Sequence, residues 1–132
     1  MILDEIIELR KQTGIDFGET YAQQLRHYKG AMHAGNLEYI SRNGRIVGFI
    51  EWVRLPRPPA TQDFSWKDYP VQKGDYVYII NMVGKGVLKE LISMAKKKNK
   101  DAKYYCYHQR VGEVIPKKFV LKIFDRTFGK EI

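Results

Sequence analysis

The sequence lacks several features that define common protein classes. Cysteine occurs once, as Cys106, so an internal disulfide and a thiolate metal cluster are both excluded. The three histidines form no recognisable ligand motif, and we expect no metal site. No apolar run approaches the roughly 20 residues of a membrane span, and the first residues carry acids where a signal peptide needs bases. We therefore expect a cytoplasmic protein without a membrane span.

The positive charge of the chain is confined to its last third. The net charge is +8, and residues 85–132 hold thirteen Lys and Arg against five Asp and Glu, while residues 1–84 balance. Such an excess attracts a polyanion, which can be nucleic acid, a membrane surface or the phosphates of a nucleotide cofactor. A solvated lysine-rich face is the alternative interpretation.

Two helices are predicted at the start of the chain, over residues 2–12 and 19–34. In the first, apolar residues recur near helical spacing, with acids early and bases late, as the helix dipole favours. Gly35 and Asn36 favour an end to the second. The expected apolar stripe of the second helix consists of Tyr21, Leu25, Tyr28 and Met32.

The clearest β pattern is a hairpin. Residues 37–42 and 45–55 are rich in β-forming side chains and flank Asn43 and Gly44. Asn-Gly between two such runs favours a type I′ turn, because both residues tolerate positive φ. A long proline-rich loop is expected over 56–74, and loops of this length commonly cover a site.

A β-α-β unit is predicted next, from strand 76–83 through helix 87–98 to strand 103–110. The first strand is nearly continuously apolar, which is typical of burial on both faces. The expected apolar face of the helix holds Val87, Leu88, Leu91, Ile92 and Ala95. The two strands should run parallel, joined by a right-handed crossover. With a last strand at 119–125, the chain is expected to form one α+β domain over residues 1–132.

The junction between strand 76–83 and helix 87–98 carries the most informative motif. Gly84 and Gly86 flank Lys85. A helix that opens directly after glycines leaves its first backbone N–H groups unpaired at the positive end of its dipole. Glycines allow a phosphate to approach that backbone, which makes the junction a candidate pyrophosphate site. A tight turn without a ligand is the alternative.

In this setting the chain resembles the GNAT acyltransferases over roughly residues 37–110. The family pattern Gln/Arg-X-X-Gly-X-Gly/Ala corresponds here to Asn81 through Gly86, with Asn81 in place of Gln or Arg. The resemblance implies a GNAT-like mixed sheet with a central β-α-β crossover, preceded here by N-terminal helices. It also implies acyl-CoA, such as acetyl-CoA, as co-substrate. The implied cofactor-binding residues are Met82, Val83, Gly84, Lys85, Gly86 and Val87.

Three further sequence features qualify this resemblance. A fainter similarity to the hemolysin-activating lysine acyltransferases rests on Gly74-Asp75, on Asn81 where that group carries a catalytic Asp, and on Trp52. The usual first strand of the GNAT fold is absent from the start of the chain. Residues 111–119 are too short for the family's late helix with its Asn and Tyr, so a GNAT-like fold without catalysis remains open.

The candidate catalytic residues are Glu51, Asn81, Tyr107 and His108. N-acyl transfer needs a base for the amine and an acid for the leaving thiolate. Glu51 lies mid-strand among apolar neighbours and is the candidate base, with a solvent-facing Glu as the alternative. His108 is a second candidate base and Tyr107, like Tyr105, a candidate acid, although such residues more often pack in a core. Asn81 could polarise a thioester carbonyl or bond a neighbouring strand.

Three functions follow from these patterns. The first is an acyl-CoA-dependent N-acyltransferase that acts on an amine acceptor, which can be a protein. The second is a non-catalytic GNAT-like protein-interaction module that uses loop 56–74. The third is a nucleic-acid-binding accessory protein, in which exposed tyrosines and lysines of strand 103–110 stack on bases and pair with phosphates.

Overall fold

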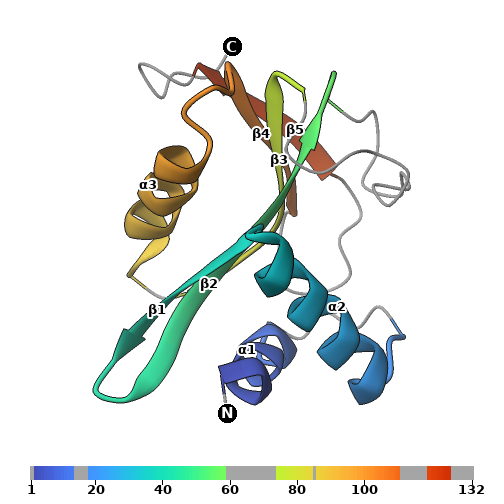
Figure 1. The fold of residues 1–132 in the computed structure, drawn as a ribbon, viewed down its shortest axis with the longest axis vertical. Helices are drawn as coiled ribbons and strands as arrows, with labels where there is room; N and C mark the ends of the chain where they lie inside the picture. Colours follow the sequence, from blue (N-terminus) through green and yellow to red (C-terminus); the bar gives the residue numbers. More distant parts are fainter. Residues whose placement is uncertain (1, 14–17, 59–73, 85, 111–118, 126–132) are drawn as a thin grey trace. The chain divides into compact units, whose positions relative to one another are not determined.

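A computed structural model of the chain describes residues 2–13, 18–58, 74–84, 86–110 and 119–125 (Figure 1). Every predicted helix and strand is present, with ends that differ from the prediction by at most one or two residues. The elements are α1 (Ile2–Lys11), α2 (Tyr21–Ala34), β1 (Leu37–Arg42), β2 (Arg45–Leu55), β3 (Tyr76–Gly84), α3 (Leu88–Lys98), β4 (Tyr104–Arg110) and β5 (Phe119–Asp125). The strand order in the sheet is β1-β2-β3-β4-β5.

The chain forms two compact units. The first consists of Met1–Glu51 and Asn81–Ala95, and the second of Trp52–Ile80 and Lys96–Ile132. The strands β2 and β3 and the helix α3 each contribute residues to both units. The expectation of one domain over residues 1–132 stays a prediction, and each unit is described by itself below.

In the first unit, α1 and α2 lie next to each other beside the β1–β2 hairpin (Figure 1). Helix α2 begins with a capping box, in which the Thr20 hydroxyl accepts from the Gln23 N–H and the Gln23 side chain accepts from the Thr20 N–H. It ends at Gly35, which adopts a left-handed φ of 77°. Both ends of α2 therefore satisfy backbone groups that a helix terminus otherwise leaves unpaired.

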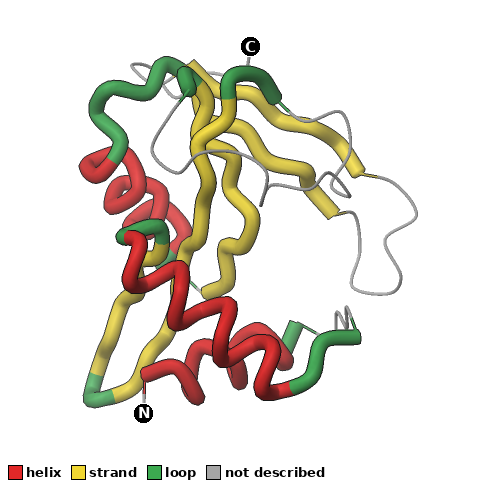
Figure 2. Tube along the Cα trace, turned by 45° about the vertical axis from the view of Figure 1, so that its right-hand side comes forward, coloured by secondary structure: helices red, strands yellow, loops and turns green. Residues whose placement is uncertain are grey.

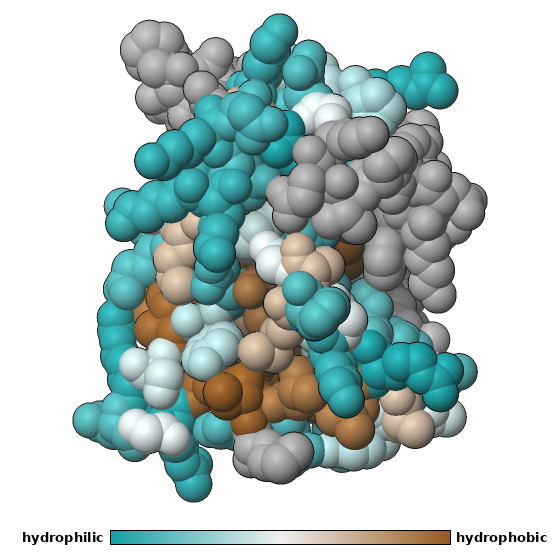
Figure 3. Space-filling model, in the orientation of Figure 1, coloured by the Kyte–Doolittle hydropathy of each residue, from teal (hydrophilic) through white to brown (hydrophobic). Residues whose placement is uncertain are grey.

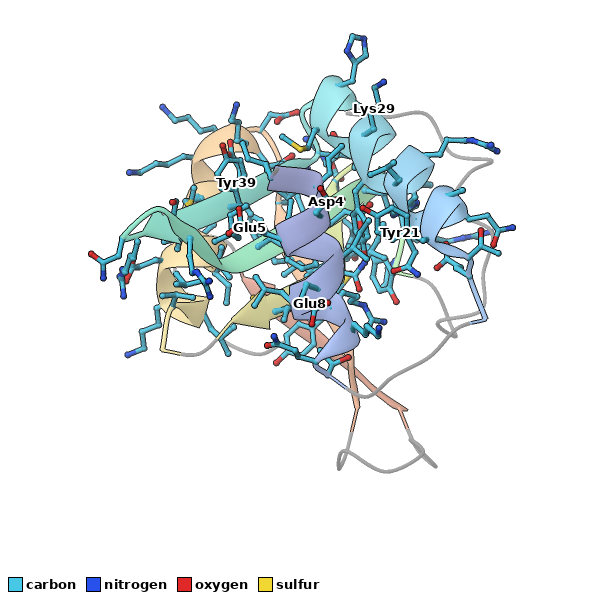
Figure 4. All side chains as sticks on the ribbon, turned by 90° about the horizontal axis from the view of Figure 1, so that it is seen from below. Asp4, Glu5, Glu8, Tyr21, Lys29 and Tyr39 are labelled. Carbon is cyan, nitrogen blue, oxygen red and sulfur yellow. The ribbon has the colours of Figure 1, made fainter. Side chains whose placement is uncertain are left out.

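The hairpin confirms the turn prediction. Asn43 and Gly44 both have positive φ, at 53° and 77°, and Arg42 pairs with Arg45 directly across the turn. The register shifts between Ile40 and Ser41, where β2 carries an extra residue. The N-terminal helix is joined to this hairpin by Glu5, whose carboxylate accepts the backbone N–H of Ile46 at 3.1 Å (Figure 4).

The core of the first unit is built from the helices and the hairpin. Its buried side chains are Ile6, Ile7, Tyr28, Leu37, Ile46 and Phe49. The rings of Tyr28 and Phe49 meet edge to face at 5.6 Å, a favoured aromatic arrangement. Hydrophobic side chains of this region also reach the surface on the lower part of the face in Figure 3.

Burial along the central strands differs from the prediction. Strand β3 was expected to be buried on both faces, yet its residues from Ile80 to Gly84 are only half-buried. Strand β2 is instead buried continuously from Gly48 to Leu55, and this run includes Glu51 and Arg54. The prediction failed because apolar composition alone does not show which strand receives neighbours on both faces.

The second unit contains the parallel pair that the β-α-β pattern predicted. Strands β3 and β4 pair in parallel from Tyr76 opposite Tyr104 to Tyr78 opposite Cys106, and β4 pairs with β5 antiparallel (Figure 2). The rings of Tyr76 and Tyr104 stack at 4.9 Å. A cluster of Val53, Leu55, Tyr78 and Cys106 is buried here.

Two side chains that were expected on apolar helix faces are exposed. Tyr21 in the first turn of α2 is 52% exposed, and Leu88 in the first turn of α3 is 42% exposed. Both occupy the first position of their helix, where the periodic face has not yet reached the core. In the part of the chain that the structure describes, no helix is long and apolar enough to cross a lipid bilayer.

Candidate functional site

The strand–glycine–helix junction is present in the first unit. Strand β3 ends at Gly84, and the Leu91 N–H donates to the Val87 carbonyl at 3.0 Å, which makes Val87 the last residue before the helix. The backbone N–H groups of residues 88–90 therefore precede the first intrahelical donor. They lie at the positive end of the α3 dipole. Lys85, which was expected to add charge here, lies outside the described residues.

The space beside Gly84 is filled by the protein itself. A β-carbon on Gly84 would lie 2.7 Å from Val87 Cγ2, and one on Gly48 of the neighbouring strand would meet the same atom at 2.7 Å. Val87 is 1% exposed. Because Gly48 and Gly84 have no side chains, the Val87 side chain at the start of α3 packs directly against the backbone of both glycines. Gly84 thus serves strand–helix packing, and the role of Gly48 was missed by sequence reasoning.

Gly86 differs from Gly84 in both conformation and surroundings. Its φ is +75°, and apart from its chain neighbours no heavy atom of the described residues lies within 4 Å of where a β-carbon would be. The left-handed conformation explains the preference for glycine, and the open space leaves room for a ligand at the helix start. Of the other predicted cofactor residues, Met82 and Val83 are half-buried on β3.

The first turn of α3 also carries an acid. The Glu90 carboxylate accepts from the Arg42 guanidinium at 2.7 Å, and both side chains are 53% exposed. An unpaired carboxylate here would repel an anionic ligand. The Arg42 partner offsets that charge, so the helix start remains compatible with a phosphate.

A buried polar cluster surrounds Glu51, and we call these side chains the Glu51 cluster: Arg10, His27, Tyr28, Glu51 and Asn81. Glu51 is 2% exposed, so the solvent-facing alternative is wrong. Both carboxylate oxygens are bonded, one to Asn81 Nδ2 at 2.8 Å and the other to His27 Nε2 at 2.6 Å. The contact with His27 is an ion pair when the imidazole is protonated. A buried carboxylate with partners on both oxygens meets the usual condition for burying a charge.

Asn81 joins Glu51 to the first helix. Its Oδ1 accepts from Arg10 Nε at 2.9 Å. Arg10 Nη1 also donates to the Thr13 hydroxyl, which itself donates to the Arg10 carbonyl and so closes the last turn of α1. Arg10 is 8% exposed, and burial lowers its pKa from the usual value. The predicted pair Glu51 and Asn81 is therefore brought together, and Arg10 is added to it.

Tyr28 completes the cluster from α2. Its hydroxyl is hydrogen-bonded to Arg10, and burial, with the nearby Glu51 charge, raises its pKa above the usual value for tyrosine. The ring of His27 packs edge-on against the ring of Tyr28 at 5.0 Å. Sequence reasoning missed Arg10, His27 and Tyr28 as site residues. A pattern search cannot find them, because each lies 23 or more positions from Glu51 in the sequence.

The remaining catalytic candidates lie on β4, in the second unit. Tyr107 is half-buried and pairs with Lys122, and His108 pairs with Leu121 in the β5 register. Tyr105 is 2% exposed and its hydroxyl donates to the Asn99 carbonyl. Tyr105 therefore packs in the core, the alternative given above for this candidate acid, and cannot be one of the exposed tyrosines that the nucleic-acid-binding hypothesis requires.

Cys106 packs as a small apolar residue, as expected. It is fully buried, and burial raises the pKa of its thiol to about 12. Among residues 2–13, 18–58, 74–84, 86–110 and 119–125, no three His, Cys, Asp or Glu side chains are grouped so that they could hold a metal ion. Loop 56–74, the proposed protein contact, lies almost entirely outside the described residues.

Comparison with known proteins supports the fold. The chain is similar to a protein of solved structure from Staphylococcus aureus Mu50, described as a "putative acetyltransferase", with a TM-score of 0.50 and 22% sequence identity. The likeness covers 82% of this chain and 71% of the other. No family model and no curated protein matches the chain. The mixed α+β fold is GNAT-like. The similarity to hemolysin-activating acyltransferases stays a prediction.

Proposed function

We propose that the protein is an acyl-CoA-dependent N-acyltransferase that transfers an acyl group to an amine. The observation that carries this proposal is the junction between β3 and α3 within a GNAT-like fold. At that junction backbone N–H groups of residues 88–90 precede the first helical hydrogen bond, next to an open, left-handed Gly86. An anionic pyrophosphate suits such a helix start.

The Glu51 cluster supports the second half of the proposal. Glu51 belongs to the same unit as the β3–α3 junction, and Asn81 lies three residues before Gly84 on β3. A carboxylate and a hydrogen-bond donor are the groups that amine deprotonation and carbonyl polarisation require. In this proposal Glu51 is the candidate base and Asn81 polarises the thioester carbonyl.

The test is a binding measurement with a matched glycine control. Gly86→Val should abolish the binding of acetyl-CoA and of free CoA, because a branched side chain would fill the space beside the first N–H groups. Gly35→Val is the control, since Gly35 has φ +77° and equally open surroundings but caps a different helix. It carries the same backbone strain and should bind CoA as the unchanged protein does. Calorimetric titration measures both affinities.

Thermal stability provides an independent readout. Ligand at 100 times its Kd stabilises the folded state by about 2.7 kcal/mol, which raises Tm by several degrees in a domain of this size. No shift with millimolar acetyl-CoA and CoA would contradict the proposal. Binding without transfer to any of a panel of amines, peptides and proteins would instead favour the non-catalytic interaction module.

A further inference from the structure

The orientation of the Asn81 amide is determined by its two partners. Arginine has only donors, so Arg10 Nε can bond only the oxygen of the amide, at 2.9 Å. The Glu51 carboxylate has only acceptors, so it bonds the nitrogen, at 2.8 Å. A flipped amide would place oxygen against carboxylate and N–H against guanidinium. Arg10 and Glu51 therefore enforce the same single orientation.

In this orientation the amide retains one donor. Asn81 Nδ2 carries two hydrogens, and one of them is directed to Glu51. The second N–H has no partner among the residues that the structure describes. Asn81 is half-buried, so this N–H is not sealed in the core. The Asn81 amide can therefore donate this second N–H to a ligand. Its carbonyl oxygen cannot face the ligand instead, because that oxygen accepts from Arg10.

The place of this donor suits the acyl end of the proposed co-substrate. Asn81 precedes Gly84 by three strand residues, which is about 10 Å along β3. The arm of acyl-CoA connects its pyrophosphate to its thioester, so a pyrophosphate at the start of α3 leaves the thioester free to reach along the strand. Its carbonyl oxygen needs a donor as negative charge develops.

We propose that Arg10 is a positioning residue that makes Asn81 present its N–H, rather than its oxygen, to the acyl carbonyl. This inference rests on the proposed acyl transfer. The amine nitrogen attacks the carbonyl carbon, and the C=O electron pair moves onto the oxygen that Asn81 faces. This attack forms the C–N bond. When the electron pair on oxygen re-forms the C=O bond, the C–S bond breaks and the thiolate leaves. The amine proton goes to the base of the site, and the departing thiolate takes a proton from water.

The wild-type protein provides the first measurement. The two side-chain N–H signals of Asn81 are assigned in a ¹⁵N NMR spectrum by their loss in Asn81→Ser. Acetyl-CoA should shift one of these two proton signals, and free CoA, which has no acyl carbonyl, should leave both in place. Backbone signals of residues 86–90 report whether each ligand binds.

The outcomes separate this inference from the proposed function. If both ligands move the backbone signals but acetyl-CoA leaves the Asn81 side chain unchanged, the donor role is overturned while the cofactor site stands. If neither ligand moves any signal, the proposed function fails and the inference fails with it. A selective shift of one Asn81 proton by acetyl-CoA supports both.

Variants of Arg10 test the positioning role. Arg10→Met should lower kcat by less than the roughly 100-fold loss typical for one oxyanion donor, because Glu51 still holds the amide nitrogen, with little change in KM for acetyl-CoA. Arg10→Lys retains a donor and should recover part of kcat, and if Arg10→Met does not fold, the Lys variant and the NMR shift still decide. Arg54→Met is the control, because Arg54 is an equally buried arginine of the second unit. Equal losses of kcat in Arg10→Lys, Arg10→Met and Arg54→Met would overturn the role.

Discussion

Each unit of the protein contains a buried arginine, and the two arginines have different partners. Arg10 in the first unit bonds the side chains of Asn81 and Thr13. Arg54 in the second unit bonds the Gly74 carbonyl through Nε at 2.9 Å and also through Nη2. It further bonds both oxygens of Asp101. Arg10 orders the side chains of Asn81 and Thr13. Arg54 connects strand β2 to the Gly74 carbonyl and to the exposed acid Asp101.

The different partners indicate a structural role for Arg54 and a candidate functional role for Arg10. The donors of Arg54 lie on a main-chain carbonyl, on the Asn99 side-chain oxygen and on a carboxylate that is 74% exposed, so its bonds hold chain segments together. The bonds of Arg10 continue through Asn81 to a carboxylate that is 2% exposed. A charge network that ends on a fully buried carboxylate is costly to retain, and it is therefore the better indication of chemistry.

The largest effect is expected at Gly74, which belongs to the Arg54 contacts. A β-carbon there would lie 2.2 Å from the Leu55 carbonyl oxygen, at a φ of +104°. Gly74→Ala should therefore cost about 4 kcal/mol from backbone strain and overpacking together. Gly35→Ala has open space at φ +77° and should cost about 1 kcal/mol. Urea denaturation measures both, and similar losses would show that Leu55 can move aside.

The next effect compares the two carboxylates directly. Glu51→Ala removes the acceptor of Asn81 and His27 and the buried negative charge of the cluster, and should destabilise the fold by about 3 kcal/mol. Asp101→Ala removes a mostly exposed partner of Arg54 and should cost less than about 1 kcal/mol. Chemical denaturation of the two variants gives the values. Equal costs would mean that the two arginine clusters do not differ in the way described above.

Alkaline pH should weaken the second unit through Cys106. Burial raises the pKa of its thiol from 9.0 to about 12, so the folded state keeps a proton that the unfolded state loses. The contribution of the protonated thiol to the free energy of unfolding is fully present below pH 9. It falls as pH rises toward 12, by about 1 kcal/mol at pH 10. Cys106→Ala should remove this part of the decline. Denaturation at pH 7, 9 and 10 compares the slopes, and unchanged slopes would contradict the burial effect.

The smallest effect is expected for the pair of Arg42 and Glu90. Both side chains are 53% exposed, and exposed ion pairs typically contribute only about 0.2–1 kcal/mol, or nothing measurable. Arg42→Ala should therefore leave stability nearly unchanged, while it removes the partner of an acid at the start of α3. If CoA binds there, its affinity should fall, because Glu90 would then repel the phosphates. Calorimetry on this variant sharpens the contrast between stabilising and functional charges.

Local sequence patterns predicted the elements because their determinants are local. The Asn43-Gly44 turn, the end of α2 at Gly35, and the parallel pairing of β3 with β4 all follow from neighbouring residues or from chain order. The exposure of Leu88 and the half-burial of β3 could not be predicted in this way, because they depend on which distant segments pack against them.

For the candidate site, the sequence by itself determined the GNAT-like β-α-β unit, the glycines before α3, and Glu51 and Asn81 as polar residues within apolar strands. Only the tertiary structure decided that Val87 fills the space beside Gly48 and Gly84. It also brought Arg10 and His27 to Asn81 and Glu51. The physical reason is that hydrogen-bond partners and packing contacts are chosen by distance in space. Residues 71 positions apart, such as Arg10 and Asn81, leave no common pattern in the sequence.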